Sequence, residues 1–524
     1  MSVVDTLGKE VLVFDGATGT MLQALGLPAG HCPDAWCLER PDLVASVHKR
    51  YGEAGAQIVE TNTFGATPVR LSRYGLQDRA GDINVAAVRI AREAMEGRTL
   101  VAGSMGPLGV LVDPLGDFSF DAAYNEFATQ ARAFREARPD FIIIETVGDL
   151  NEMRAAILAC KDHAPGVRII AQMTMSANGR TFTGTDPETA GLVLQSLGAD
   201  IIGFNCSVGP ETLVSAVERI HRVARVPVSV QPNAGMPVLQ PDGKTAFPMG
   251  PEEFASYGPG LVAAGASIVG GCCGTTPEHI RCLRRAVEGL RPGREVGPLG
   301  RAFGLASRTG SLFINPGQPA APVFIGGRID PSRRDDIAAD MREGGFSLVK
   351  KEAKEQVTAG AQVIAVSSSG PGLDEAAAME RAVRTVQRTV RVPVCLRSSS
   401  AAALEAGLKA FVGKALVGPF TLEKRTAESV LPVARRYGAA VIGLTIDEKG
   451  APSPSRRLLE TARRLVDTAA QHGIPSWDVV IEPAITSEES VNELGMIERE
   501  LGCLTCRGVF AGLDMAVITP ETAT

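Results

Sequence analysis

Short apolar runs alternate with longer amphipathic stretches through most of the chain, and this alternation limits the folds that it can adopt. Within residues 1–290 the apolar runs are Val11–Phe14, Gln57–Glu60, Thr99–Ala102, Phe141–Ile144, Arg168–Ala171, Ile201–Phe204, Val226–Val230 and Ser267–Gly270. Eight strands separated by helices predict a parallel sheet, and this is the number that closes a (β/α)8 barrel. An open doubly wound sheet is the alternative, but no Gly-x-Gly-x-x-Gly motif opens the first helix.

The second part of the chain repeats this pattern after an interruption. Residues 291–322 are rich in glycine and proline and keep few periodic apolar positions, so we interpret them as a linker. Apolar runs then return at Val323–Ile325, Gln362–Val366, Val392–Leu396, Lys414–Val417, Ala439–Ile446, Trp477–Ile481 and Met515–Ile518. We therefore predict an α/β protein of two consecutive (β/α) barrels. The first, over residues 1–290, is a complete (β/α)8 barrel, and the second, over residues 323–524, is shorter and can be incomplete.

Composition and charge exclude several classes of protein. The net charge is −6 and no arginine- or lysine-rich stripe occurs, so we expect no binding to nucleic acid. No apolar run is long enough to span a membrane, and the first residues do not resemble a signal peptide, so we expect a cytoplasmic protein. The ten cysteines form no compact framework and the six histidines have no paired spacing. A transition metal would therefore be held mainly by cysteine.

Polar or sulfur-containing residues follow nearly every predicted strand of the first barrel. The segments at these positions are Asp15-Gly16, Thr61–Thr63, Gly103-Ser104, Glu145-Thr146, Gln172–Thr174, Asn205-Cys206, Gln231–Asn233 and Gly271–Cys273. In (β/α)8 barrels the chemistry lies on the loops at the carboxyl ends of the strands. Polar residues also begin ordinary loops, but that explanation does not account for so many unusual residues at one rim.

Three of these residues are cysteines. Cys206 follows the sixth predicted strand, and Cys272 and Cys273 follow the eighth, between glycines that permit a sharp turn. Buried cysteines can simply pack as small hydrophobic residues. Three thiolates on one rim, however, suit a zinc ion whose fourth position stays open, and an open position indicates catalysis.

A zinc ion with three thiolate ligands favours activation of a thiol over activation of water. Free thiols are ionised to only a few per cent at neutral pH, and coordination to a metal removes that limit. We therefore expect alkyl transfer to a zinc-bound thiolate. Asp15 and Glu145, at the same rim, would hold the ammonium group of an amino-acid substrate. The alternative for these two carboxylates is helix capping or solvation of strand ends.

Five motifs in order resemble zinc-dependent homocysteine S-methyltransferases, in particular the homocysteine half of cobalamin-dependent methionine synthases. They are Asp15–Thr20, Glu60–Ala66, Gly203–Pro210, Gln231–Gly235 and Gly270–His279. The resemblance implies Cys206, Cys272 and Cys273 as zinc ligands, with Asn233 in the fourth position until homocysteine arrives. It also implies that Asp15, Gly16, Asn62 and Glu145 line the homocysteine pocket.

The second barrel resembles the pterin-binding domain of the same enzymes, but its binding positions are changed. Gly326-Gly327-Arg328 stands where the family has Gly-Glu-Arg, Ala365–Ser367 replaces Asp-x-Asn, and Gly418-Pro419 replaces Asn-Ser. Arg397 and Glu482 stand at two positions where the family has aspartate. A pterin needs carboxylate and amide acceptors, and each lost buried partner costs about 1–3 kcal/mol. We therefore predict that this domain does not bind folate in the manner of the family.

Together these observations predict a zinc enzyme that methylates homocysteine to methionine. The chain lacks the Asp-x-His-x-x-Gly signature of the family's cobalamin module. We expect methylcobalamin as the donor, presented in trans by a separate corrinoid protein. The alternatives are a small donor such as S-methylmethionine or betaine, methyltetrahydrofolate-linked methionine synthase activity, and a zinc-bearing scaffold without activity.

Overall fold

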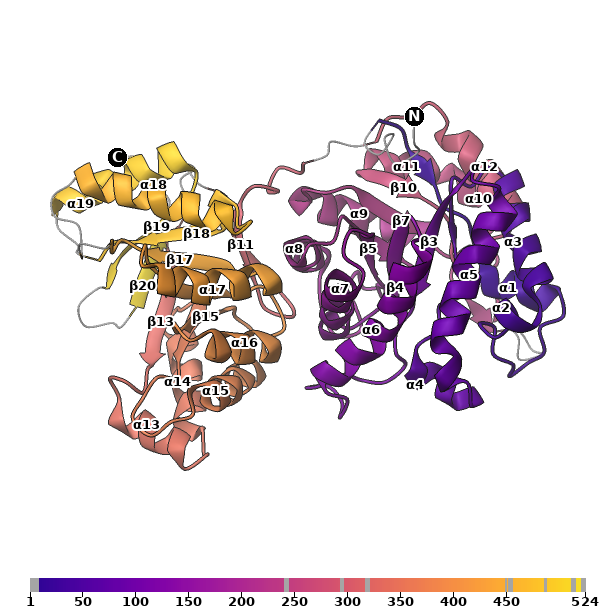
Figure 1. The fold of residues 1–524 in the computed structure, drawn as a ribbon. Helices are drawn as coiled ribbons and strands as arrows, with labels where there is room; N and C mark the ends of the chain where they lie inside the picture. Colours follow the sequence, from indigo (N-terminus) through magenta and orange to yellow (C-terminus); the bar gives the residue numbers. More distant parts are fainter. Residues whose placement is uncertain are drawn as a thin grey trace. The chain divides into compact units, whose positions relative to one another are not determined.

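The structure is a computed structural model of the 524-residue chain. It describes residues 9–239, 245–292, 296–315, 321–447, 450, 456–484, 488–509 and 515–519. The chain divides into two compact units, Met1–Gly300 and Arg301–Thr524 (Figure 1). Each unit is described by itself below.

The described part of the first unit contains a sheet of eight parallel strands. In chain order they are β1 (Leu12–Val13), β2 (Ile58–Glu60), β3 (Leu100–Met105), β4 (Phe141–Val147), β5 (Arg168–Met173), β6 (Ile201–Asn205), β7 (Val228–Gln231) and β10 (Ala266–Val269). The strands pair in the order β1-β10-β7-β6-β5-β4-β3-β2. A parallel bridge between Phe14 and Ile58 joins the two ends of the sheet. The prediction of a (β/α)8 barrel is confirmed, and all eight predicted strands are present.

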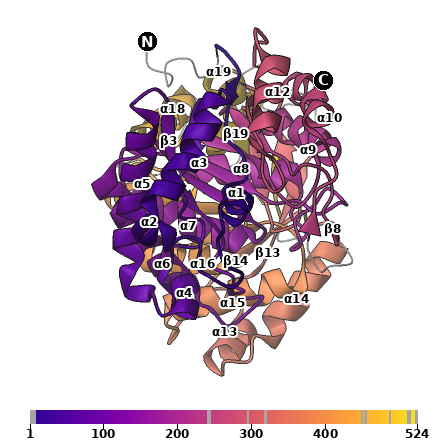
Figure 2. The same cartoon turned by 90° about the vertical axis from the view of Figure 1, so that its right-hand side faces the viewer.

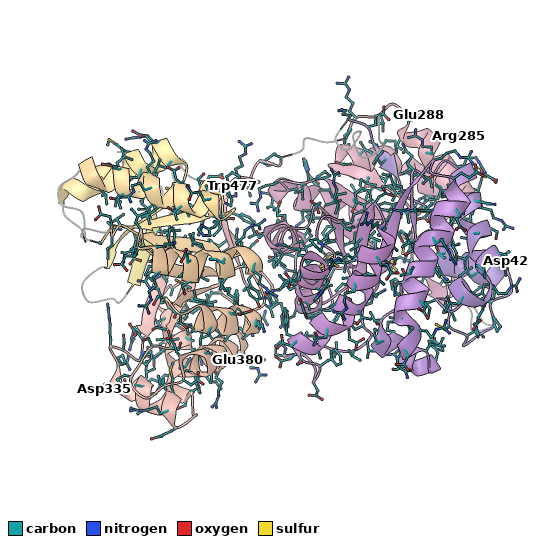
Figure 3. All side chains as sticks on the ribbon, viewed as in Figure 1. Asp42, Arg285, Glu288, Asp335, Glu380 and Trp477 are labelled. Atoms are coloured by element: carbon teal, nitrogen blue, oxygen red, sulfur yellow. The ribbon has the colours of Figure 1, made fainter. Side chains whose placement is uncertain are left out.

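Helices cover the outside of this barrel. The longer ones are α3 (Pro41–Glu53), α5 (Ala80–Met95), α6 (Phe120–Ala137), α7 (Leu150–His163), α8 (Pro187–Leu197), α9 (Pro210–Val223) and α12 (Pro277–Val287). The shorter ones are α1 (Thr18–Ala24), α2 (Trp36–Glu39), α4 (Pro68–Leu71), α10 (Pro251–Ser256) and α11 (Gly258–Ala263). Figure 2 shows α3 and α5 side by side, and α6 and α7 follow around the ring in Figure 1. Asp42, Arg285 and Glu288, labelled in Figure 3, lie exposed on the outer surface of this layer.

Local sequence signals set where these helices begin. The side chains of Ser119, Asp149 and Asp186 accept backbone N–H groups at the starts of α6, α7 and α8, which satisfies donors that have no partner within the helix. Inside the ring, large apolar side chains fill the barrel. This core consists of Leu12, Phe14, Ile58, Leu100, Ala102, Phe141, Ile143, Ile170, Ile201 and Ile268. The packed interior leaves the carboxyl ends of the strands as the place for a site.

The second unit is also a barrel, and its described strands form a closed ring. They are β13 (Val323–Ile329), β14 (Val363–Ser367), β15 (Val394–Arg397), β16 (Leu416–Phe420), β17 (Ala440–Leu444), β18 (Val479–Glu482), β19 (Leu504–Val509) and β20 (Met515–Thr519). The strands from β13 to β19 are parallel, whereas β20 is antiparallel to both β19 and β13. The prediction of a second, shorter β/α barrel is confirmed. Strand β19 was not predicted, because its sequence Leu-Thr-Cys-Arg-Gly-Val has no clear apolar run.

The helices of the second unit are α13 (Asp335–Arg342), α14 (Ser347–Thr358), α15 (Glu375–Thr389), α16 (Ala401–Ala410), α17 (Lys424–Tyr437), α18 (Arg456–Gln471) and α19 (Glu488–Leu501). They lie outside the ring of strands, and Asp335 and Glu380 mark α13 and α15 in Figure 3. None of the helices in the described residues of either unit combines the length and apolar character needed to cross a bilayer.

A hairpin lies within the segment that the sequence predicts as a linker. Strands β11 (Phe303–Ala306) and β12 (Ser311–Ile314) are antiparallel, and Phe303, Leu305 and Ile314 belong to the apolar core of the second barrel. An antiparallel bridge from Ala306 to Lys414, just before β16, fixes the hairpin at the end of the barrel where the parallel strands begin. The prediction that residues 291–322 form a linker is therefore wrong for residues 303–314, because these residues close one end of the second barrel.

Candidate functional site

A cavity with an empty volume of about 1090 Å³ lies at the carboxyl ends of the strands of the first barrel. It is lined by the α1 segment, the β2 loop and the exits of β4, β6, β7 and β10. The lining residues that bear on the argument are Gly16, Glu60, Asn62, Arg70, Ser104, Glu145, Thr146, Cys206, Gln231, Cys272 and Cys273. Arg70 is the only cation among the described residues that line this cavity. The cavity is therefore acidic and rich in sulfur.

The three predicted cysteines come together in this cavity. The Sγ atoms of Cys206, Cys272 and Cys273 all lie within 4.8 Å of one another, and those of Cys206 and Cys273 are 3.7 Å apart. Zn–S bonds of about 2.3 Å in tetrahedral geometry place sulfur atoms about 3.8 Å apart. The spacing thus fits one ion, whereas a disulfide requires about 2.05 Å.

The backbone around the cysteines is fixed by neighbouring strand exits. The amide of Cys206 donates to the carbonyl of Gln231 over 3.0 Å, and the amide of Cys272 donates to the carbonyl of Pro232 over 2.8 Å. Gly274 has a φ of +82°, and a Cβ there would lie 2.3 Å from Phe247. The turn after β10 therefore requires glycine for both conformation and space.

Hydrogen bonding among the three thiols is unequal. The other two thiols donate to Cys273 and lower the pKa of its thiol to about 4. The same contacts, together with burial, hold the pKa of Cys272 well above its usual range. One sulfur of the cluster is thus stabilised as a thiolate at the cost of its neighbours. A divalent ion would replace the shared protons with its own positive charge.

Three residues at the cysteine cluster, Cys206 among them, have left-handed backbone conformations. Thr146, Cys206 and Ser207 have φ values of 60°, 59° and 63°. Such values are uncommon for residues other than glycine and cluster at functional sites. The amide of Asn205 connects two of the exits: its Oδ1 accepts the N–H of Thr146 over 2.7 Å, and its Nδ2 donates to Glu145 Oε2 over 2.9 Å.

Three carboxyl groups lie at the same end of the barrel; those of Asp15 and Glu145 are buried, and that of Glu60 is half-buried. Ser104 Oγ donates to Glu145 Oε1 over 2.6 Å, Gln231 Nε2 donates to Glu60 Oε1 over 2.7 Å, and the N–H of Glu60 donates to Asp15 Oδ2 over 3.0 Å. Asp15 Oδ1 is buried without a hydrogen-bond partner among the described residues. An unpaired buried acceptor is costly, and a ligand that donates a hydrogen bond would satisfy it.

Burial is the main cause of the raised pKa values of these carboxyl groups. It raises the pKa of Glu145 to about 7, with the thiol of Cys206 adding to the effect. It also holds the pKa values of Asp15 and Glu60 well above their usual ranges, and the Glu145 carboxylate raises both further. A cationic group placed among the three carboxyls would reverse these shifts by favouring the charged forms.

The structure places the remaining predicted residues at or near this cavity. Gly16 lines it, and a Cβ at Gly16 would lie 2.5 Å from Thr275 Oγ1. Asn62 also lines it, and its Nδ2 donates to the carbonyl of Pro33 over 2.7 Å. Asn233 is buried beside the cysteine turn, where the amide of Ala234 donates to the carbonyl of Cys273 over 3.0 Å. Its Oδ1 has no hydrogen-bond partner among the described atoms.

Sequence analysis did not assign a role to several residues of the cavity. Glu60 was part of a motif, and its position at the end of β2 could have identified it as a rim carboxylate. Asp34 and Arg70 also line the cavity, but they come from helix and loop segments that do not directly follow a strand. No spacing in the sequence places those two residues at the rim.

The mouth of the second barrel has a different chemistry. Arg397, at the end of β15, contacts both oxygens of Glu482, at the end of β18, with Nη1–Oε2 and Nη2–Oε1 distances of 2.9 and 3.5 Å. Arg328 turns outward to pair with Glu352 over 3.1 Å. The serines after β14 and β15 serve mainly as local supports. Ser368 donates to the carbonyl of Glu375 over 2.9 Å, Ser398 donates to the Glu375 side chain over 2.6 Å, and Ser400 caps α16.

Comparisons with known proteins agree with the two-part organisation. The sequence matches the family model described as "Homocysteine S-methyltransferase" over residues 12–287, and the one described as "Pterin binding enzyme" over residues 340–500. The methionine synthase of Mycobacterium tuberculosis is 32% identical over 510 residues, which cover 92% of this chain and 42% of that protein. The methionine synthase of Mycobacterium leprae is 30% identical over 506 residues, with the same coverage. The chain thus spans less than half the length of these relatives.

Solved structures match each part of the chain separately. The metallated form of the homocysteine methyltransferase MmuM from Escherichia coli has 26% identity and a TM-score of 0.46, and the match covers 54% of this chain and 98% of that one. The 7,8-dihydropteroate synthase from Vibrio fischeri has 16% identity and a TM-score of 0.30, with coverage of 38% and 76%.

Proposed function

The chain belongs to the homocysteine S-methyltransferase family, and on this premise we propose that it methylates the sulfur of homocysteine to form methionine. Residues 1–290 would be the homocysteine-binding domain, and Cys206, Cys272 and Cys273 would hold one zinc ion. The observation that carries the proposal is the cluster of three thiols inside a cavity that also holds buried carboxyl groups. When bound, zinc would stabilise the anionic form of a substrate thiol at neutral pH.

The carboxyl groups supply the binding site for the substrate's ammonium group in this proposal. Glu145 and Asp15, with Glu60 beside them, would surround that group, and Asp15 Oδ1 would gain the partner that it lacks. Asn205 and Ser104 hold Glu145 from both sides, so that its carboxylate is oriented before the substrate arrives. Gly16 and Asn62 would form the remaining walls around the substrate.

We assign Asn233 to the fourth ligand position in the absence of substrate. Its unpartnered Oδ1 and the hydrogen bonds of its neighbours to the Cys272-Cys273 turn support this assignment. A neutral amide is a weak ligand for zinc compared with thiolate, so a substrate thiol would displace it readily. A reducing compartment such as the cytoplasm would keep the three thiols available.

We propose methylcobalamin, carried by a corrinoid protein, as the methyl donor. Exposed apolar side chains on the segments that follow β3, β5 and β7 support a macromolecular donor, because they lie on the same end of the barrel as the cysteines. These side chains are Leu111, Leu115, Phe182, Met236 and Val238. The second barrel belongs by its match to the pterin-binding enzymes, but its lost acceptors favour a role other than folate binding.

The test is a comparison of methyl donors. Zinc-loaded protein is incubated with homocysteine and, in turn, methylcobalamin, S-methylmethionine, betaine and methyltetrahydrofolate, and methionine is quantified. Methionine formed from methylcobalamin supports the whole proposal. Turnover only with S-methylmethionine or betaine would keep the methyltransferase and overturn the corrinoid donor. Methionine from methyltetrahydrofolate alone would show that the second barrel is competent for folate, and none from any donor would favour a scaffold.

A further inference from the structure

The second barrel contains a cavity of its own, with an empty volume of about 930 Å³. Its deep walls are apolar and come from the inner faces of the strands. These side chains are Ile325, Ala365, Leu416, Ile442, Val480 and Ile518, together with the thiols of Cys395 and Cys506. The same apolar core continues to the hairpin β11–β12, which closes the opposite end of the barrel. The cavity therefore has an apolar interior and a charged mouth at the carboxyl ends of the strands.

The described charged residues at the mouth of this pocket form two ion pairs. Arg397 contacts Glu482 through both guanidinium Nη atoms, and Arg333 lies 3.6 Å from Asp330. The pairing balances two cations with two carboxylates. The Arg397 and Glu482 side chains are only 35% and 18% exposed, so this pair is partly removed from water. Partly buried charges of this kind need a partner at all times.

A pterin does not fit this mouth. Its ring presents N–H donors that need several acceptors, but the two described carboxylates at this mouth, Glu482 and Asp330, are already paired with Arg397 and Arg333. A pterin that took Glu482 would leave the Arg397 guanidinium without an anion. At the position where the family has glutamate, this chain has Gly327, which lines the pocket and offers no side-chain acceptor.

We propose that the second barrel binds a small zwitterion with an apolar tail, of the α-amino acid type. The ligand's carboxylate would replace Glu482 on the fork of Arg397, which matches a planar carboxylate with two parallel hydrogen bonds. Its ammonium group would lie against the carboxylate released from Arg397, with Asp330 at the same mouth. One ion pair would thus be exchanged for two, and every charge would keep a partner.

The interior of the pocket determines which side chain the amino-acid ligand carries. The aliphatic walls, formed by residues such as Leu416, Ile442 and Val480, favour an unbranched or branched hydrocarbon side chain over a polar one. The polarisable sulfur atoms of Cys395 and Cys506 lie on the same walls and are compatible with a thioether tail. The inference does not depend on methyl transfer in the first barrel, because the two cavities share no residue.

The test measures binding of L-norleucine to the full chain by isothermal titration calorimetry. L-Norleucine has no sulfur, so it does not bind through a metal in the first barrel. Hexanoate lacks the ammonium group and pentylamine lacks the carboxylate, and each is expected to bind at least tenfold more weakly. Tetrahydrofolate is the fourth ligand, and we expect no binding at comparable concentrations.

Variants assign the binding to the second barrel. Arg397→Ala and Glu482→Gln should each weaken L-norleucine binding at least tenfold, and Arg397→Lys should retain part of it. Arg463→Ala removes an exposed ion pair with Glu500 (2.8 Å) in the same unit, and should leave binding unchanged. Glu93→Gln, at an exposed glutamate on α5 of the first barrel, should also leave it unchanged. Binding that is lost in Glu145→Gln but kept in Glu482→Gln would overturn the proposal, as would tight binding of tetrahydrofolate or no binding of L-norleucine.

Discussion

The mouths of the two barrels differ in how their charged groups are partnered. In the first barrel, Asp15, Glu60 and Glu145 lie together near three thiols, and Asp15 Oδ1 has no partner among the described residues. In the second barrel, Arg397 and Glu482 satisfy each other across the mouth. An unpaired buried acceptor, as in the first mouth, can be satisfied by a ligand directly. A ligand of the second mouth must first separate a pair of charges and then partner both of them. Two β/α barrels in one chain thus make opposite demands on a ligand.

The largest effect is expected from removing a sulfur atom of the first mouth. Cys272→Ala should release zinc and lower methyl transfer at least 1000-fold, or about 4 kcal/mol, because the remaining two thiols hold the ion weakly. The matched control is Cys282→Ala, a cysteine on α12 outside the cavity, which should keep its metal. Metal content is measured by plasma mass spectrometry. A full equivalent of zinc in Cys272→Ala would contradict the ligand assignment.

The hairpin at the closed end of the second barrel offers a comparison of stability. Phe303 is fully buried in the barrel core, so Phe303→Ala should lower the free energy of unfolding of this unit by about 3–5 kcal/mol. Leu312→Ala, at a half-buried position on the same hairpin, should cost less. Urea unfolding followed by hydrogen exchange in each unit measures the difference. If Phe303→Ala left the second barrel as stable as before, the hairpin would be a linker after all.

The free energy of unfolding of the first barrel should depend on pH through its buried acids. Burial raises the pKa of Glu152 to about 7, and its Oε1 accepts the N–H of Leu108 over 2.6 Å. Between pH 4.5 and 7 the folded chain keeps a proton that the unfolded chain has released, so the free energy of unfolding falls as pH rises. The loss should be on the order of 3 kcal/mol.

Thermal unfolding between pH 4.5 and 8 measures this effect. Glu152→Gln should make the pH profile less steep, because its amide does not titrate, while Asp15, Glu60 and Glu145 keep their own contributions. A wild-type profile that rises over the same interval would be the opposite of the expected sign.

The smallest expected effect concerns substrate affinity at the first mouth. Glu145→Gln should raise the KM for homocysteine about 10- to 100-fold with zinc retained, because one carboxylate of the ammonium site becomes neutral. Glu93→Gln, an exposed glutamate on α5, is the matched control. Steady-state kinetics with each variant measures the change. An unchanged KM would mean that Glu145 supports the residues around it and does not bind the substrate.

Much of the fold could be predicted because the buried strands of a parallel barrel are short apolar runs in the sequence. All eight strands of the first barrel and seven of the second followed from that pattern. Strand β19 did not, since Thr505, Arg507 and Gly508 interrupt its apolar character. The hairpin β11–β12 was not predicted, because its glycine- and proline-rich surroundings suggest a linker. The turn between Phe303–Ala306 and Ser311–Ile314 could have indicated it.

The sequence by itself determined that Cys206, Cys272 and Cys273 lie on one rim, because the carboxyl ends of parallel strands in a barrel all meet at the same end. It could not determine that Asp15 keeps an unpaired oxygen or that Arg397 meets Glu482, which lies 85 positions away. Such pairings depend on the register of the strands and on side-chain packing across the ring. Only the tertiary structure settles these distances, and they decide which of the two barrels leaves acceptors free for a ligand.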